Sequence, residues 1–252
     1  MKTLQRSAGV AFVTLAAFGA QAAEVQVAVA ANFAVPLERI SVGFSAATGH
    51  TLKVAAGSTG KFYSQIIGGA PFEVLIAADD ETPKKLITEG HAVAGSNFTY
   101  AIGKLVLWSA KPDFVDGQGA VLGSARFAHL AIANPKVAPY GAAGLQVIKA
   151  RGLSEALAPK LVTGESIAQA FQFVSTGNAD LGFVALSQVA VPGKPAVGSY
   201  WLVPQELYGE IRQDAVLLKP GADNPAAKAL LAYLKSPAAQ EVIRAFGYGI
   251  GM

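Results

Sequence analysis

The stretch VQVAVAANFAVPLERISVGFSAATGHTLKVAAGSTGKFYSQIIGGAPFEVLIA, residues 25–77, decides the fold. Short apolar runs alternate in it with segments of helical periodicity, in the order 25–30, 34–48, 51–55, 61–67 and 73–77. This alternation is typical of βαβ units. The runs VQVAVA and EVLIA do not alternate polar with apolar residues, as expected for strands covered by helices on both faces of a sheet. The sequence therefore predicts an α/β fold.

The same rhythm continues to the C-terminus. Further apolar runs lie at 101–108, 130–133, 161–162, 180–186 and 214–218, and further helices are expected over 81–89, 141–151, 167–175, 224–235 and 238–246. We expect two lobes, each with a mostly parallel sheet, joined by two crossover segments. Lobe 1 would comprise residues 23–101 and 205–252, and lobe 2 would comprise residues 102–204.

The first 22 residues read as a secretory signal peptide. Lys2 and Arg6 flank an apolar run over 8–20, and Ala20-Gln21-Ala22 supplies small residues for cleavage. The run is shorter than the roughly 20 residues that span a bilayer. The chain has no cysteine, so it carries neither disulfides nor the lipid-modified cysteine that tethers some exported proteins. We therefore predict a periplasmic protein without a membrane anchor, and we expect a monomer.

Charge gives no reason to expect a nucleic-acid partner. Removal of Lys2 and Arg6 leaves 18 of the 20 basic residues against 17 acidic ones. The basic residues are scattered, without the one-faced stripe that neutralises several phosphates at once.

Four turns from strand to helix carry the candidate ligand-binding residues. In an open α/β sheet, ligands bind beyond the carboxyl ends of strands, where helix N-termini offer unpaired N–H groups. The polar groups at these turns are Asn32, expected as a helix N-cap that can donate through its amide, Ser58 and Thr59 within GSTG, Tyr140 after Pro139, and Ile167 after the N-cap Ser166. Each turn alone is compatible with ordinary capping, whereas the four together point to an anion.

Catalysis and cation binding are disfavoured. GSTGK departs from the phosphate-binding loop of nucleotide-binding proteins, since Ala55 and Phe62 stand at two of its required positions. Ser58 lacks the G-x-S-x-G context of a nucleophile, and the pair Asp79-Asp80 stands where a helix cap is expected. The three histidines, His50, His91 and His129, lack metal-ligand spacing. We therefore expect a binding protein that uses no cofactor and is not an enzyme.

At this point the chain resembles a known family, the periplasmic molybdate-binding proteins of ABC importers. The resemblance spans essentially the whole chain after the leader, and it is carried by VAVAANF (27–33), GSTGKFYSQIIGGAPFEVLIAADD (57–80), GSNFTYAIGKLVLWSAKP (95–112), IANPKVAPYGAAGLQV (132–147), GNADLGFVALSQ (177–188) and YLKSPAAQEVIRAFGYG (233–249). It implies a two-lobed, Venus-flytrap fold, capture of molybdate or tungstate, and a membrane permease as partner. Sulfate, thiosulfate or another tetrahedral oxyanion is the alternative ligand.

The resemblance also implies roles for individual residues. Asn32 and Thr59 would bind the oxyanion from one lobe, with Ser58 as an adjacent candidate, and the backbone N–H groups of Tyr140 and Ile167 would bind it from the other. The metal would be held only through its oxygens, with no direct protein ligand. Many relatives carry a tyrosine hydroxyl where this chain has Ala185, and the Asn32 amide is expected to compensate for it in part.

Overall fold

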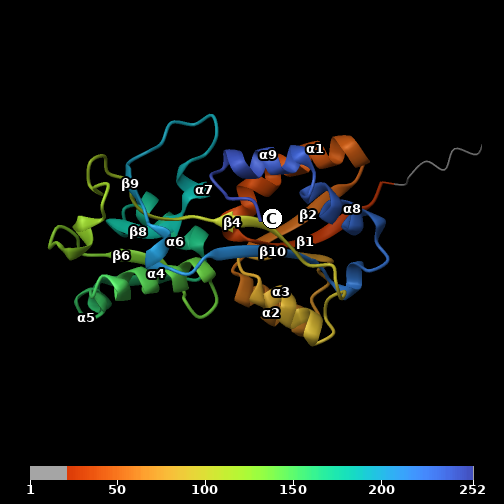
Figure 1. The fold of residues 1–252 in the computed structure, drawn as a ribbon, viewed down its shortest axis with the longest axis horizontal. Helices are drawn as coiled ribbons and strands as arrows, with labels where there is room; N and C mark the ends of the chain where they lie inside the picture. The colour runs from red at the N-terminus through yellow and green to blue at the C-terminus, as the bar shows by residue number, and fades with distance from the viewer. Residues whose placement is uncertain (1–21, 252) are drawn as a thin grey trace, which may run out of the picture.

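Two five-stranded sheets organise the molecule. The computed structural model describes residues 22–251, so the predicted signal peptide lies outside them except for Ala22. The sheets have the strand orders β2-β1-β3-β10-β4 and β7-β6-β8-β5-β9, and each forms the centre of one lobe (Figure 1). We call these the first and the second lobe. The predicted two-lobed α/β fold is confirmed.

Both sheets are mixed. The first contains β1 (Glu24–Ala30), β2 (Thr51–Gly57), β3 (Val74–Ile76), β4 (Phe98–Gly103) and β10 (Ile211–Leu217), and the second contains β5 (Leu105–Ser109), β6 (Leu130–Ala133), β7 (Leu161–Gly164), β8 (Leu181–Ala185) and β9 (Ser199–Leu202). β1 and β6 each pair in parallel with two neighbours, whereas β10 and β5 each pair antiparallel with two. The expected parallel character thus applies to half of the pairs. β5 and β10 each enter a sheet directly from the other lobe, and antiparallel neighbours need no crossover helix.

Helices cover both faces of the first sheet. On one face lie α1 (Ala34–Thr48), α8 (Pro225–Leu234) and α9 (Pro237–Ala245), and on the other lie α2 (Thr59–Ile67) and α3 (Glu81–Thr88) (Figure 1). α1 buries Leu37, Ile40 and Phe44, whose spacing of three and four residues places them on one side of the helix. This packing explains why the strands between the helices are apolar on both sides.

The second sheet is covered in the same way. α4 (Pro139–Ala150) and α6 (Ile167–Ser175) pack on opposite faces, because the space beside Gly144 of α4 is filled by Phe183, while Val174 of α6 lies against the adjacent Gly182. The short helices α5 (Ser154–Leu157) and α7 (Leu186–Val189) complete this lobe. Trp108 and Trp201 are both buried in its core.

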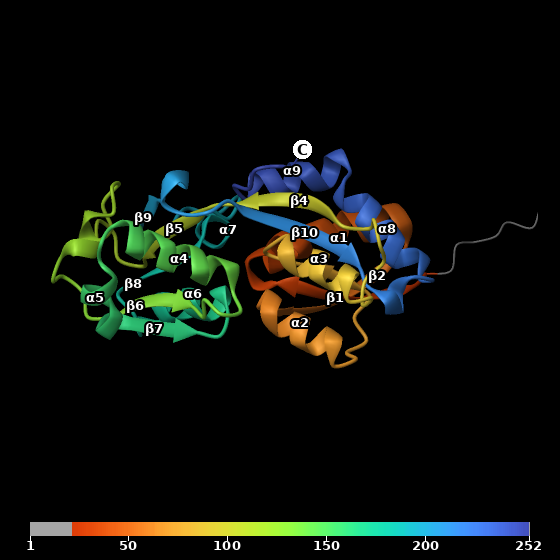
Figure 2. The same cartoon turned by 60° about the horizontal axis from the view of Figure 1, so that its bottom comes forward.

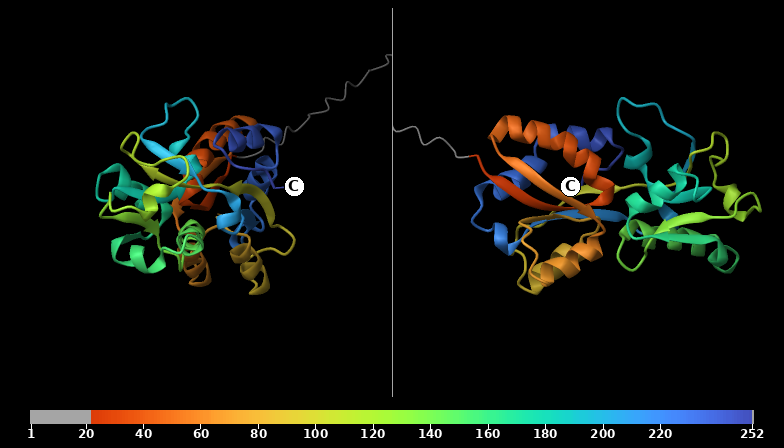
Figure 3. Two further views of the ribbon diagram at one scale, coloured as in Figure 1. Left: turned by 60° about the vertical axis from the view of Figure 1, so that its left-hand side comes forward. Right: turned by 180° about the vertical axis from the view of Figure 1, so that it is seen from behind.

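The chain passes between the lobes in two places. A single residue, Lys104, separates β4 of the first sheet from β5 of the second, and residues 203–210 lead back from β9 to β10. β4 and β10 pair antiparallel, so the two connections leave the first lobe side by side (Figure 2). The views in Figure 3 show the lobes meeting end to end along the long axis of the molecule. Within residues 22–251, no helix has the length and apolarity needed to cross a membrane.

Candidate functional site

The five residues predicted for the site surround one small cavity between the lobes. Asn32, Ser58 and Thr59 line it from the first lobe, and Tyr140 and Ile167 line it from the second. The cavity lies beyond the carboxyl ends of β1 and β2, and the segments that follow β6 and β7 face it from the other lobe. The rule that ligands bind at these strand ends therefore located the cavity.

Two buried hydroxyls enter the cavity from the start of α2. The Ser58 Oγ is buried without a hydrogen-bond partner among residues 22–251. The Thr59 Oγ1 accepts the backbone N–H of Ala78 at 2.9 Å, so its own proton remains available to donate. A buried hydroxyl without a partner is costly, and a ligand with acceptor oxygens would satisfy both groups.

The second lobe presents backbone donors. Tyr140 and Ile167 lie in the first turns of α4 and α6, where N–H groups have no carbonyl one turn earlier to bond. Neither N–H forms a hydrogen bond with another residue of the described chain. The predicted cap Ser166 accepts from the N–H of Gln169 at 3.4 Å, and this bond fixes the start of α6. Two helix N-termini thus direct partial positive charge at the cavity.

Asn32 differs from its prediction in two respects. It is not the N-cap of α1, because a 3₁₀ turn over Ala31–Phe33 precedes that helix. Its Nδ2 donates to the Oε1 of Gln213 at 2.8 Å and to the hydroxyl of Tyr248 at 3.0 Å. Both amide hydrogens therefore have acceptors in the protein, and the donor that Asn32 can offer a ligand is its backbone N–H.

Ala185, where relatives were expected to carry a tyrosine donor, does not line the cavity. It is fully buried at the end of β8 in the core of the second lobe. Its N–H donates to the Oε1 of Gln188, whose Nε2 in turn donates to the carbonyl of Ile167. Gln188 thus links the end of β8 to the first residue of α6.

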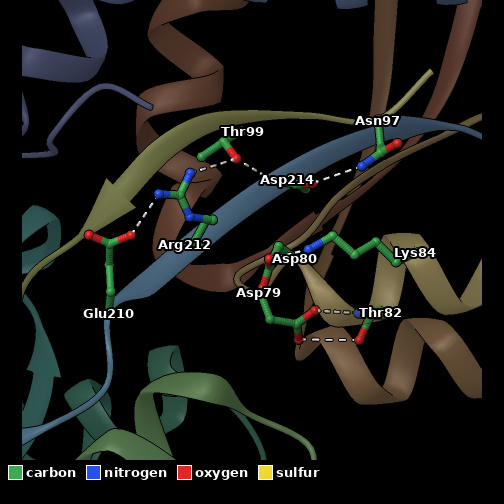
Figure 4. A network of polar contacts seen from close by, with 9 residues as sticks. All are labelled: Asp79, Asp80, Thr82, Lys84, Asn97, Thr99, Glu210, Arg212 and Asp214. Carbon is green, nitrogen blue, oxygen red and sulfur yellow. Dashed lines mark hydrogen bonds and ion pairs between the residues drawn. The ribbon is translucent and has the colours of Figure 1, made fainter. Parts of the chain in front are cut away.

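Carboxylates gather beside the cavity and not within it. A larger cleft opens next to it, and its lining includes Asp79, Asp80 and Arg212. As Figure 4 shows, Asp79 accepts from the N–H of Thr82 at 2.8 Å, and Asp80 pairs with Lys84. The N-cap of α3 is Asp80, whose side chain makes no capping bond, and the Asp79 carboxylate binds the first turn from one residue earlier. Burial raises the pKa of the Asp79 carboxyl. No charged side chain of residues 22–251 lines the small cavity itself.

Arg212 and Asp214 anchor the other half of this polar network in the strand β10 (Figure 4). Arg212 contacts Glu210 at 3.0 Å, and Asp214 accepts from the hydroxyl of Thr99 at 2.7 Å. Each of these carboxylates thus has a partner within its own lobe. An anion in the cavity would face peptide and hydroxyl dipoles only.

The lobes touch around the cavity. The N–H of Gly60 in α2 donates to the carbonyl of Val137 in the second lobe at 2.9 Å. Lys61 forms an ion pair of 2.7 Å with Glu165 across the same gap, and both side chains are exposed. An exposed pair contributes at most about 1 kcal/mol. The described arrangement is therefore a closed one, in which donors of both lobes reach the same space.

Three tyrosines are buried at or near the cavity, and they make the free energy of unfolding depend on pH above 10. Burial raises the pKa of Tyr100 and of Tyr140 well above the usual range, and it raises the pKa of Tyr248 from 10.0 to about 12. The folded state therefore keeps protons that the unfolded chain releases. This stabilisation is complete below pH 10 and is lost as the pH rises toward 12.

We expect the free energy of unfolding to fall between pH 10 and 12, by about 3 kcal/mol from Tyr248 alone. Urea unfolding at a series of pH values measures this fall. Tyr248→Phe serves as the control, because it should flatten the pH dependence by its own share while other basic groups titrate unchanged. A wild-type curve that is level from pH 10 to 12 would contradict the assignment.

Sequence reasoning missed several residues around the site. Ala78 follows β3 and orients Thr59, and Gln213 and Tyr248 hold Asn32. Ala78 could have been found, because it lies at the carboxyl end of a third parallel strand, where the rule for the other turns also applies. Gln213 and Tyr248 carry no local signal, since they come from a crossing strand and from the C-terminus.

Comparison with known proteins places the chain. Residues 25–249 match the family model described as bacterial extracellular solute-binding protein. The molybdate-binding protein ModA of Azotobacter vinelandii is 64% identical over 236 residues, covering 94% of both chains, and ModA of Rhodobacter capsulatus is 57% identical, covering 92% of this chain and 90% of its own. A solved structure, the Azotobacter vinelandii periplasmic molybdate-binding protein, superimposes with a TM-score of 0.88 at 43% identity, over 90% of this chain and 100% of that chain. The chain therefore belongs to the bacterial extracellular solute-binding proteins, in the family of periplasmic molybdate-binding proteins.

Proposed function

We propose that this protein captures molybdate, and tungstate in the same way, between its two lobes and delivers it to the membrane permease of an ABC importer. One observation carries the proposal: hydroxyl and backbone donors from both lobes converge on a cavity lined by no charged side chain of the described chain. Molybdate and tungstate are tetrahedral dianions whose oxygens only accept hydrogen bonds. A lining of hydroxyl and backbone donors without a carboxylate matches that chemistry.

The donors can be assigned individually. The Ser58 and Thr59 hydroxyls would bind from the first lobe together with the backbone N–H of Asn32, and the N–H groups of Tyr140 and Ile167 would bind from the second. Hydrogen bonds to a charged group contribute about 1.5–3 kcal/mol each. About five of them can offset the cost of association and still reach the roughly 8 kcal/mol of micromolar binding. A lysine, an arginine or a bound cofactor is not needed.

The proposal extends to the location, the oligomeric state and the motion of the protein. The protein would act as a monomeric carrier in the periplasm after removal of residues 1–22, without a membrane anchor and without catalysing a reaction. Residues 23–101 and 205–252 would move as one lobe and residues 102–204 as the other, except that Ile102 and Gly103 would stay with β4 in the first lobe. Opening and closing would be a hinge motion at the two connections between the sheets.

Isothermal titration of the ligand-stripped chain 23–252 with molybdate, tungstate and sulfate tests the proposal. We expect one-to-one binding of the first two at micromolar or tighter dissociation constants, and little heat with sulfate, because the smaller anion cannot reach all donors at once. Preference for sulfate would move the assignment to the alternative oxyanion. Silence with all three anions would overturn oxyanion capture.

A further inference from the structure

Gln213 occupies an unusual place in the molecule. It lies on β10, the strand that follows the return connection from the second lobe, and none of its surface is exposed to solvent. Its Oε1 accepts from Asn32 at 2.8 Å and from the hydroxyl of Tyr100 at 3.0 Å, and its Nε2 donates to the hydroxyl of Tyr140 at 3.0 Å. The amide thus bonds to one cavity residue from each lobe, Asn32 and Tyr140.

We infer that Gln213 is a positioning residue that couples the anion site to closure of the lobes. Two donors of the first lobe hold its Oε1, so its Nε2 must point toward the second lobe. In the closed arrangement that donor finds Tyr140. When the lobes separate, Tyr140 leaves with its lobe, and the donor exchanges this partner for water that enters the opened gap, at a net cost of about 1 kcal/mol. The bond therefore favours the closed state in which the cavity is complete.

The backbone around Gln213 is shaped for this bond. The pairing of β10 with β4 shifts at Gln213, so that Tyr100 becomes an extra residue without a partner on β10. Such a bulge redirects side chains next to functional sites, and here it brings the Tyr100 hydroxyl to Gln213. Opposite them, a Cβ on Gly103 would lie 2.3 Å from the Tyr140 hydroxyl and 2.5 Å from the Gln213 Nε2. Only glycine leaves room for the bond at the point where the chain crosses between lobes.

A second set of bonds reinforces the same contact. The hydroxyl of Ser187 in the second lobe donates to the carbonyl of Asn32 at 2.9 Å, and Tyr248 contacts both of these groups. Asn32 is therefore held from both lobes, through its amide by Gln213 and through its carbonyl by Ser187. The side chains that fix its backbone in the cavity are the ones that join the lobes.

Tyr140→Phe tests the inference most directly. It removes the hydroxyl that Gln213 holds and keeps the backbone N–H assigned to the anion. We expect the ratio of closed to open molecules to fall about tenfold in the ligand-free protein, and the apparent affinity for molybdate to fall by about the same factor through faster release. The affinity arm of this test rests on the proposed function, whereas the ligand-free arm does not.

The matched control is Tyr100→Phe. It removes an equally buried hydroxyl from the same glutamine, but the contacts of this hydroxyl, with Gln213 and with the carbonyl of Ala77, both stay within the first lobe. Distances between spin labels on Val42→Cys and Lys149→Cys, one exposed site in each lobe, report closure, and the chain has no other cysteine. Tyr100→Phe should leave the distances unchanged and alter affinity less than threefold. Adding Tyr140→Phe to Gln213→Met should weaken binding no further than Gln213→Met alone, since the bond between these two side chains is then already broken.

The outcomes separate the two ideas. If the wild-type protein does not bind molybdate but the label distances still widen in Tyr140→Phe, the proposed function is overturned and the coupling is supported. Wild-type molybdate binding with unchanged distances and affinity in Tyr140→Phe overturns the coupling. Equal effects of Tyr100→Phe and Tyr140→Phe would also overturn it, because they would reflect general loss of packing.

Discussion

Replacement of Thr59 by valine is expected to weaken molybdate binding about a hundredfold. Thr59 is 1% exposed, and its hydroxyl both accepts the Ala78 N–H and faces the cavity. Valine has the same shape but cannot donate, so one hydrogen bond to the anion is lost at a cost of about 1.5–3 kcal/mol. Each 1.4 kcal/mol corresponds to a factor of ten. Titration calorimetry with molybdate measures the change directly.

Thr59→Ser is the matched control for this substitution. Serine keeps the hydroxyl and should retain binding within about fivefold, while the loss of one buried methyl lowers stability by about 1 kcal/mol. Valine, in contrast, also leaves the N–H of Ala78 without an acceptor, which lowers stability by about 1–3 kcal/mol. If Thr59→Val bound molybdate as tightly as the wild type, Thr59 would have no part in the site.

Replacement of Gly60 by alanine is expected to reduce affinity by a similar factor through a different cause. A Cβ on Gly60 would lie 2.9 Å from the Cα of Val137 and 3.0 Å from its Cβ, in the opposite lobe. Such distances are too short, so closure would stop before the donors of both lobes reach the anion. The open protein has no such conflict. Alanine within a helix is more favourable than glycine by about 0.5–1 kcal/mol.

The expected result for Gly60→Ala is therefore weak binding in a protein as stable as the wild type. Calorimetry with molybdate and thermal unfolding without ligand measure the two quantities separately. Gly209→Ala is the control near the same cleft, since its added Cβ would meet only the Gln146 Oε1 at 3.7 Å, an ordinary contact. Wild-type affinity in Gly60→Ala would show that the lobes need not approach this closely.

Local sequence signals determined much of the fold in advance. The helix over 34–48 ends where predicted because Gly49 adopts a left-handed conformation, with φ of 74°. The helix over 167–175 begins where predicted because Ser166 caps it. Both signals act within a few residues, so one sequence suffices to read them.

Long-range pairing could not be predicted in the same way. The apolar run 101–108 reads as one segment, but its two halves belong to different sheets, and only Lys104 separates them. No local pattern states that the strand Ile211–Leu217 inserts between β3 and β4. These pairings depend on contacts between residues more than a hundred positions apart.

In the candidate site, too, local features were predicted and long-range contacts were not. The turns were found because strand ends and helix starts are visible in the sequence, and the structure brings all five predicted residues to one cavity. The partners of Asn32 were not found, because Gln213 and Tyr248 lie 181 and 216 positions away. As a result the sequence predicted a free amide donor where the structure has a bonded one.

The strand order of the first sheet also dictates the sequence in which the protein can assemble. All strands of the second sheet lie within residues 105–202, whereas the first sheet lacks an internal strand until residue 217. A chain that is made from its N-terminus folds in the order in which its parts appear. The second lobe can therefore fold while the first sheet, with only β1 to β4 present, still lacks its internal strand β10. The N-terminal strands are thus completed last, and the cavity between the lobes can form only when nearly the whole chain is available.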